Sequence, residues 1–157
     1  MLLAQDNEIK VSAQTVKSYE KNIVDKKEIF IMKEAVLTSN APQPIGPYSQ
    51  AVLSKGILYI SGQLPLNPNT NKLAIGIEDQ TRQCLENLKH ILREKGLEMN
   101  SVLKTTIFVT DLSDFQTVNE IYAEYFSKPF PARSTIQVAE LPMNAMIEIE
   151  LMAEVKR

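Results

Sequence analysis

The clearest pattern of apolar and polar residues lies near the end of the chain, where aliphatic residues and glutamates alternate between Met146 and Val155. A period of two places the aliphatic side chains on one face of a β-strand and the carboxylates on the other. A preceding run alternates in the same way and puts Arg133 and Thr135 on one side. If these two strands pair as neighbours, Arg133 shares one sheet face with Glu148 and Glu150, opposite the core.

From Met32 onward the pattern predicts the order strand, loop, two strands, helix, strand, helix, two strands. The first strands are expected at 33–38, 50–54 and 57–61, with Lys55–Gly56 as a hairpin turn. Apolar residues recur at helical spacing from Ile77 to Leu92, and Gly96 stands where a helix C-cap glycine belongs. After a strand at 103–110, Ser113 and Gln116 form a capping box for a second helix. Two helices and six strands predict an α+β layer pair, with both helices on one face of a mixed sheet.

The other face of this sheet is expected to carry a mixture of polar and apolar side chains. Its members are Lys104, Thr106, Phe108, Arg133, Thr135, Gln137, Glu148 and Met152. Such a surface is too apolar to face water and too polar for an ordinary core, whereas a subunit interface with wet pockets satisfies both demands. We therefore expect a closed homo-oligomer.

Composition narrows the class of protein. The 157 residues fit one domain, and a net charge of -2 argues against a partner such as nucleic acid or an anionic membrane. One cysteine forms no internal disulfide, and neither a signal peptide nor a membrane-spanning apolar run is apparent, so a soluble cytoplasmic protein is expected. Residues 1–31 are rich in lysine and lack glycine and proline, and they are predicted to be an N-terminal extension before a domain at 32–157.

Few residues could carry chemistry. Arg133 could grip a carboxylate with its fork of donors, or it could form a salt bridge with Glu148 or Glu150 across the strands. Glu148 could be a surface charge or a proton shuttle whose pKa is adjusted by a partly apolar site.

Other candidates have equally plain alternatives. Tyr48 follows a Gly46–Pro47 turn and either covers the core edge or is presented over a pocket, and Gly62 permits close approach of a ligand to the backbone. Cys84 is expected to be a buried small hydrophobe and His90 a surface residue. With one cysteine and one histidine, no metal-ligand cluster of familiar spacing is present.

Four segments together resemble the reactive intermediate deaminase family, known as RidA/YjgF. They are NAPQPIGPYSQAV, ISGQLPLNPNT, KTTIFVTDLSDFQTVNEIY and FPARSTIQVAELPMNAMIEIE, in family order and spacing across nearly all of residues 32–157. The resemblance implies a chorismate-mutase-like α+β fold and a homotrimer with sites at subunit interfaces. It also implies hydrolysis of reactive enamines and imines, such as 2-aminoacrylate, to 2-keto acids and ammonia, without a metal or another cofactor.

The resemblance assigns roles residue by residue. The arginine of the P-A-R-S motif, Arg133, would grip the substrate carboxylate, and the glutamate of the I-E-I motif, Glu148, would position or activate water. Tyr48, Asn119 and Gly62 would line the site. Many members carry cysteine where this chain has Thr135, which puts thiol-based activity in doubt here but leaves carboxylate binding through the Thr135 backbone and hydroxyl open.

Two other functions remain open from the sequence. One is the ribonuclease or translation-inhibitor activity reported for some members of the family, against which the acidic composition argues. The other is a non-enzymatic trimer in which Arg133 binds keto acids without turnover.

Overall fold

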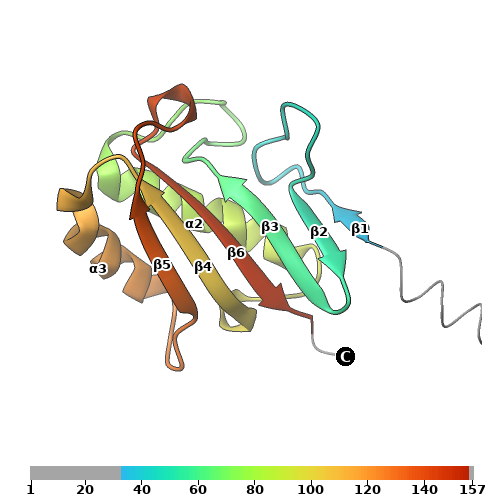
Figure 1. Cartoon of the computed structure of the whole chain (residues 1–157). Coiled ribbons are helices and arrows are strands. Elements are labelled where there is room, and N and C mark those ends of the chain that lie inside the picture. Colours follow the sequence, from blue (N-terminus) through green and yellow to red (C-terminus); the bar gives the residue numbers. More distant parts are fainter. Residues whose placement is uncertain (1–32, 156–157) are drawn as a thin grey trace, which may run out of the picture. The chain divides into compact units, whose positions relative to one another are not determined.

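Six strands form one mixed sheet in the order β1-β2-β3-β6-β4-β5 (Figure 1). The structure is a computed structural model and describes residues 33–155. The strands are β1 (Glu34–Val36), β2 (Ala51–Ser54), β3 (Ile57–Gln63), β4 (Val102–Val109), β5 (Ala132–Gln137) and β6 (Ile147–Glu154). All neighbouring strands are antiparallel except β4 and β5, which are parallel. The predicted extension at 1–31 lies outside the described residues.

Two helices, α2 (Gly76–Arg93) and α3 (Phe115–Tyr125), lie on one face of the sheet (Figure 1). Short 3-10 turns occur at Met99–Ser101, Leu112–Asp114 and Pro142–Asn144. The order of elements and the α+β class therefore confirm the sequence prediction. None of the helices in the described part of the chain is long and apolar enough to cross a membrane.

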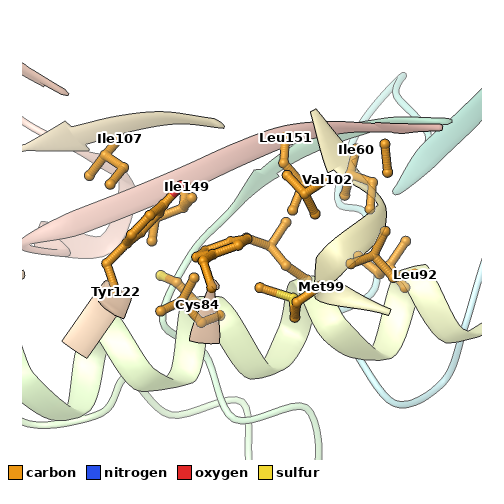
Figure 2. Close-up of a cluster of buried hydrophobic side chains, with 14 of the residues drawn as sticks. Ile60, Cys84, Leu92, Met99, Val102, Ile107, Tyr122, Ile149 and Leu151 are labelled. Carbon is orange, nitrogen blue, oxygen red and sulfur yellow. The ribbon is translucent and has the colours of Figure 1, made fainter. Parts of the chain in front are cut away.

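The core fills the space between the sheet and the helices (Figure 2). Helix α2 contributes buried residues at helical spacing, among them Cys84, Leu88 and Ile91, and β6 contributes Ile149 and Leu151. The aliphatic residues of β6 are buried and its glutamates are more exposed, as the alternation predicts. This alternation fixes the orientation of Glu148, which points to the open face of the sheet.

The hairpin between β2 and β3 turns through two residues with positive φ. Lys55 has φ 51° and Gly56 has φ 80°, which are the left-handed conformations that a tight two-residue β-turn requires. Ser54 and Ile57 are register partners on either side of the turn. The predicted hairpin is confirmed.

The predicted partnership of the last two strands is wrong. Strand β4 lies between β5 and β6, so that Arg133 and Glu148 do not lie on adjacent strands. The parallel register places Arg133 beside Thr105, which is buried beneath the helices. Because side chains alternate along a strand, Arg133 points to the helix side of the sheet and Glu148 to the open side.

The same register corrects the expected composition of the open face. Thr135 and Gln137 also pair with buried residues of β4, whereas Ser134 and Ile136 pair with Thr106 and Phe108 and lie on the open face. The remaining predicted members of this face are placed there, namely Lys104, Thr106, Phe108, Glu148 and Met152. The side chains of β5 alternate as predicted, but which set faces the helices depends on the register with the neighbouring strand.

The predicted capping box of α3 is also wrong. The side chain of Asp111 accepts a hydrogen bond from the Ser113 backbone N–H at 2.8 Å, and this caps the preceding 3-10 turn. Helix α3 itself has no side-chain cap, and Gln116 instead donates to Glu120. The side-chain cap in this region therefore belongs to the 3-10 turn and not to α3.

Candidate functional site

A bulge in β3 interrupts its pairing with the C-terminal strand, β6. Ile60 pairs with Leu151 and Gln63 with Ile149, so that Ser61 and Gly62 together face a single residue of β6. Such a bulge bends the strand and re-aims the side chains around it. The Ser61 hydroxyl donates to the Ser49 carbonyl at 2.7 Å, and this bond ties the bulge to the loop before β2.

The carboxylate of Glu148 lies directly against Gly62. A Cβ atom built on Gly62 would be 1.8 Å from Oε1 and 2.7 Å from Cδ of Glu148. A side chain at residue 62 would therefore displace the carboxylate, and only glycine leaves room for this approach. Burial, and to a smaller extent the charge of Glu150, raises the pKa of Glu148 above its ordinary value.

Glu148 and Gly62 line a cavity of about 500 Å³. Its polar lining includes Tyr48 and Ser61, and its apolar lining includes Ile45, Leu64 and Met143. The combination of an apolar wall with a few polar groups is typical of small-molecule sites.

The loop before β2 forms one wall of this cavity. Gly46 has φ +128°, and the Tyr48 backbone N–H donates to the Gly46 carbonyl at 2.9 Å in a tight turn. The turn leaves the Tyr48 side chain 52% exposed at the cavity. The placement agrees with the interpretation in which a preset turn presents Tyr48 over a pocket.

The side chain of Gln50 fixes this loop through hydrogen bonds to backbone groups. Its side chain is buried and binds both backbone groups of Thr38, accepting from the N–H at 2.8 Å and donating to the carbonyl at 3.1 Å. The same amide donates to the carbonyls of Ala41 and Pro42 at 3.3 and 2.8 Å. The buried amide of Gln50 therefore hydrogen-bonds to several loop carbonyls at once, and this single side chain keeps the cavity wall in place.

Arg133 lies in a different place, on the edge strand β5. Its guanidinium carbon is 4.9 Å from the ring centroid of Tyr122 and 5.7 Å from that of Phe115, both on α3. Within residues 33–155 Arg133 takes part in none of the four ion pairs, so the salt bridge to Glu148 or Glu150 that the sequence left open does not form in the chain. A guanidinium held by aromatic faces keeps its N–H donors for another partner.

Two other predicted residues lie near Arg133 and not near the cavity. Asn119 is half-buried on α3, one helical turn from both Phe115 and Tyr122 and thus on the same side of the helix. Thr135 is half-buried two residues along β5, beside Ile107. The six predicted site residues therefore form two groups in one chain: Tyr48, Gly62 and Glu148 at the cavity, and Arg133, Thr135 and Asn119 at the β5 edge.

Several residues around these groups were not predicted. No motif in the sequence singles out Met143, Gln50 or Tyr122 as part of a site. Cys84 is buried as expected, and burial raises the pKa of its thiol. Among the described residues, no cluster of three or more histidine, cysteine, aspartate or glutamate side chains could hold a metal ion.

Comparison with known proteins assigns the chain to a family. Residues 38–155 match the family described as Endoribonuclease L-PSP, and the chain belongs to this family, which includes the RidA and YjgF proteins. Solved structures share the fold: that of Escherichia coli TdcF with bound serine has a TM-score of 0.75 and 40% identity, over 79% of this chain and 100% of that one.

Relatives of known sequence carry more specific names. A chloroplastic protein of Arabidopsis thaliana named Reactive Intermediate Deaminase A is 53% identical over 78% of this chain and 66% of its own length. A human protein named 2-iminobutanoate/2-iminopropanoate deaminase is 44% identical over 78% of this chain and 90% of its own length. Other relatives are named only as RutC family proteins.

Proposed function

We propose that this protein hydrolyses reactive enamines and imines, such as 2-aminoacrylate, to 2-keto acids and ammonia. The observation that carries the proposal is the half-buried Glu148 carboxylate, which lies against Gly62 in a cavity of about 500 Å³ and whose pKa is raised by burial. Relatives named as imine deaminases support it.

The reaction needs only proton transfer and orientation. An enamine first tautomerises to the imine, and the oxygen of water then attacks the imine carbon while Glu148 accepts a proton from the water. Glu148 returns this proton to the nitrogen, which gives a carbinolamine. It then takes the proton of the carbinolamine hydroxyl and passes it to the amine, so that the carbon–nitrogen bond breaks, the carbonyl forms and ammonia leaves. A carboxyl group whose pKa is raised above its ordinary value suits both steps, because it has to take up and release a proton in each turnover.

Arg133 is the group best suited to bind the substrate carboxylate, because its planar donors match a carboxylate in bidentate fashion. In the substrate, however, the carboxylate is bonded directly to the carbon that water attacks. Arg133 and Glu148 must therefore reach the two ends of one small molecule, yet in one chain they point to opposite faces of the sheet with β4 between them.

We therefore infer that the site is completed by a second copy of the chain. Strand β5 is an edge strand and Arg133 is exposed on it, so this edge of one copy can approach the cavity of another. Thr135 and Asn119 would come with Arg133, and Tyr48 and Gly62 with Glu148. A homotrimer with its sites at subunit interfaces satisfies this requirement with closed symmetry.

Release of ammonia and keto acid from freshly generated 2-aminoacrylate tests the proposal. The parent should accelerate release, and Arg133→Ala should lose about 100-fold in kcat/KM because the substrate is no longer oriented. Arg93→Ala is the matched control, since Arg93 pairs with Glu98 near the end of α2 and should keep full activity. Full activity in a folded, assembled Arg133→Ala protein would remove Arg133 from the mechanism.

The same measurement separates the two alternatives. A parent protein that binds 2-oxobutanoate without releasing ammonia from the imine would be a keto-acid-binding protein. A parent protein that shows neither property, but binds and cleaves RNA in a salt-sensitive way, would match the family description instead.

A further inference from the structure

The guanidinium of Arg133 lies over two aromatic rings at the edge of the sheet. Tyr122 is the closer ring, with the guanidinium carbon 4.9 Å from its centroid, and Phe115 lies at 5.7 Å. Both rings come from α3 and stand one above the other, seven residues apart on the same side of the helix. The two rings differ in burial, since Tyr122 is 5% exposed and Phe115 is 41% exposed.

Tyr122 is itself fixed by two further contacts. Its hydroxyl lies 2.9 Å from the hydroxyl of Thr105, which is fully buried. Its ring stacks on Phe126 with centroids 4.2 Å apart and an interplanar angle of 30°. Burial raises the pKa of Tyr122, so the phenol stays neutral.

Thr105 is linked to Arg133 in two ways, through the backbone and through Tyr122. It is the register partner of Arg133 in the parallel pair of β4 and β5, so the two residues are adjacent through the backbone. The Thr105 hydroxyl holds Tyr122, and the Tyr122 ring meets the guanidinium. The position of the Arg133 guanidinium therefore depends, through Tyr122, on Thr105 of the neighbouring strand β4.

We propose that Tyr122, through its ring, is the positioning residue that fixes the guanidinium of Arg133 for binding the substrate carboxylate. The identity of the substrate in this inference rests on the proposed function, whereas the contacts between Tyr122 and Arg133 do not depend on it. A ring beneath the guanidinium attracts the cation and leaves the donors at its rim free for a bidentate contact. It also orders a long side chain before the substrate arrives, so that less rotamer freedom is lost on binding.

A purely structural role for Tyr122 predicts different behaviour. In that case its loss would lower the stability of the fold, and any effect on substrate binding would be independent of Arg133. The two roles are separable because Tyr122→Phe keeps the ring and removes the hydroxyl, whereas Tyr122→Leu removes the ring. Tyr125→Leu is a matched control, since Tyr125 lies on the same helix but contacts Lys89 and not Arg133.

The first measurement is the relaxation of the Arg133 Nε–H group by NMR, assigned by its loss in Arg133→Lys. In the ligand-free parent protein this group should be ordered, with an order parameter of about 0.8, and Tyr122→Leu should lower the value below about 0.6. Tyr122→Phe and Tyr125→Leu should leave it ordered. An Arg133 group that is already flexible in the parent, or still ordered in folded Tyr122→Leu, would overturn the inference.

The second measurement is a double-mutant cycle of Tyr122→Leu and Arg133→Lys on kcat/KM for 2-aminoacrylate hydrolysis. Tyr122→Leu alone should reduce kcat/KM about 10-fold, mainly through KM, and Tyr122→Phe should recover most of this loss. In the Arg133→Lys background, Tyr122→Leu should cost less than about 2-fold, because coupled residues are not additive. Additive losses would assign Tyr122 a purely structural role.

The two measurements also separate this inference from the proposed function. If the parent protein releases no ammonia, the deaminase proposal fails, and the NMR result together with the same cycle on the dissociation constant of 2-oxobutanoate still decides the role of Tyr122. If the parent protein is active but Arg133 is not ordered by Tyr122, only the positioning role fails.

Discussion

The Glu148 carboxylate occupies the space that a side chain at Gly62 would fill, with Oε1 at 1.8 Å from the position of a Cβ atom. The two residues come from adjacent strands and meet where the bulge in β3 interrupts the pairing with β6. The absence of a side chain at residue 62 is thus part of the geometry that places the proposed proton shuttle.

Gly62→Ala should therefore reduce activity more than stability. The methyl group displaces the carboxylate from its position at the cavity, and kcat/KM should fall about 100-fold because a misplaced proton acceptor no longer reaches the attacking water. Deamination kinetics together with thermal unfolding would measure the two effects separately.

Gly96→Ala provides the opposite pattern as a control. A Cβ atom at Gly96 meets nothing within 4 Å, but the residue has φ +65°, which strains alanine. This variant should lose about 1 kcal/mol of stability and keep its activity. Equal activity in Gly62→Ala and the parent would show that the position of Glu148 does not matter.

A site shared between copies predicts complementation between two inactive variants. Arg133→Ala and Glu148→Gln should each lose nearly all activity as homotrimers, whereas trimers refolded from an equal mixture should regain about a quarter of the parent activity. This fraction follows because one in four neighbouring pairs then joins an intact Arg133 to an intact Glu148 in a closed ring. Ammonia release from mixed trimers, verified by native mass spectrometry, is the measurement.

The matching control mixes Arg133→Ala with the double variant Arg133→Ala/Glu148→Gln, in which no subunit supplies the arginine. This mixture should stay inactive. Recovery in neither mixture, despite confirmed subunit exchange, would mean that Arg133 and Glu148 do not act in one shared site.

The sequence predicts the elements well because each has a local cause. The alternation of β6, the helical spacing of α2 and the Lys55–Gly56 turn depend on neighbouring residues, and all three appear in the structure. The orientation of Glu148 follows from the same alternation, since the aliphatic residues of β6 have to be buried.

The orientation of Arg133 could not be obtained in this way. Strand β5 is an edge strand with no fully buried residue, so its own pattern does not show which side faces the helices. The parallel register with β4 decides this, and it depends on a crossover through α3 that is long-range in sequence. The division of the candidate site into two groups is a consequence of this topology.

Gln50 offers a test of how the cavity wall is maintained. Gln50→Leu keeps the volume of the side chain but leaves backbone groups of Thr38 and Pro42 without their buried partner. We expect a loss of about 3 kcal/mol in the free energy of unfolding and a higher KM, since the loop that carries Tyr48 is no longer tied down. Urea denaturation and deamination kinetics would measure both.

Gln116→Leu is the control for this substitution, because Gln116 is exposed on α3 and its side chain donates a hydrogen bond to Glu120. It should change stability by less than about 0.5 kcal/mol. If Gln50→Leu were as stable as this control, the buried amide would not be what holds the loop.

The pH dependence of activity should report Glu148. Because burial raises its pKa above the ordinary value near 4.5, kcat/KM should rise with pH through a limb above 4.5 as the carboxylate ionises and can accept a proton. The charge of Glu150 contributes to this shift, so Glu150→Gln should move the limb to lower pH while activity on the plateau is kept. A limb that stays in place in Glu150→Gln would assign it to another group.

Stability should change with pH in the opposite sense. A carboxyl group with a raised pKa in the folded state keeps a proton that the unfolded chain has already released, so stability is greatest below about pH 4.5 for this group and falls as pH rises through the folded pKa. Glu148→Gln cannot lose this proton, and its unfolding midpoint should decline less than that of the parent protein between pH 4.5 and 7. A variant that is inactive at pH 7 yet more resistant to heat than the parent would show that the half-buried carboxylate is retained for reaction at the expense of stability.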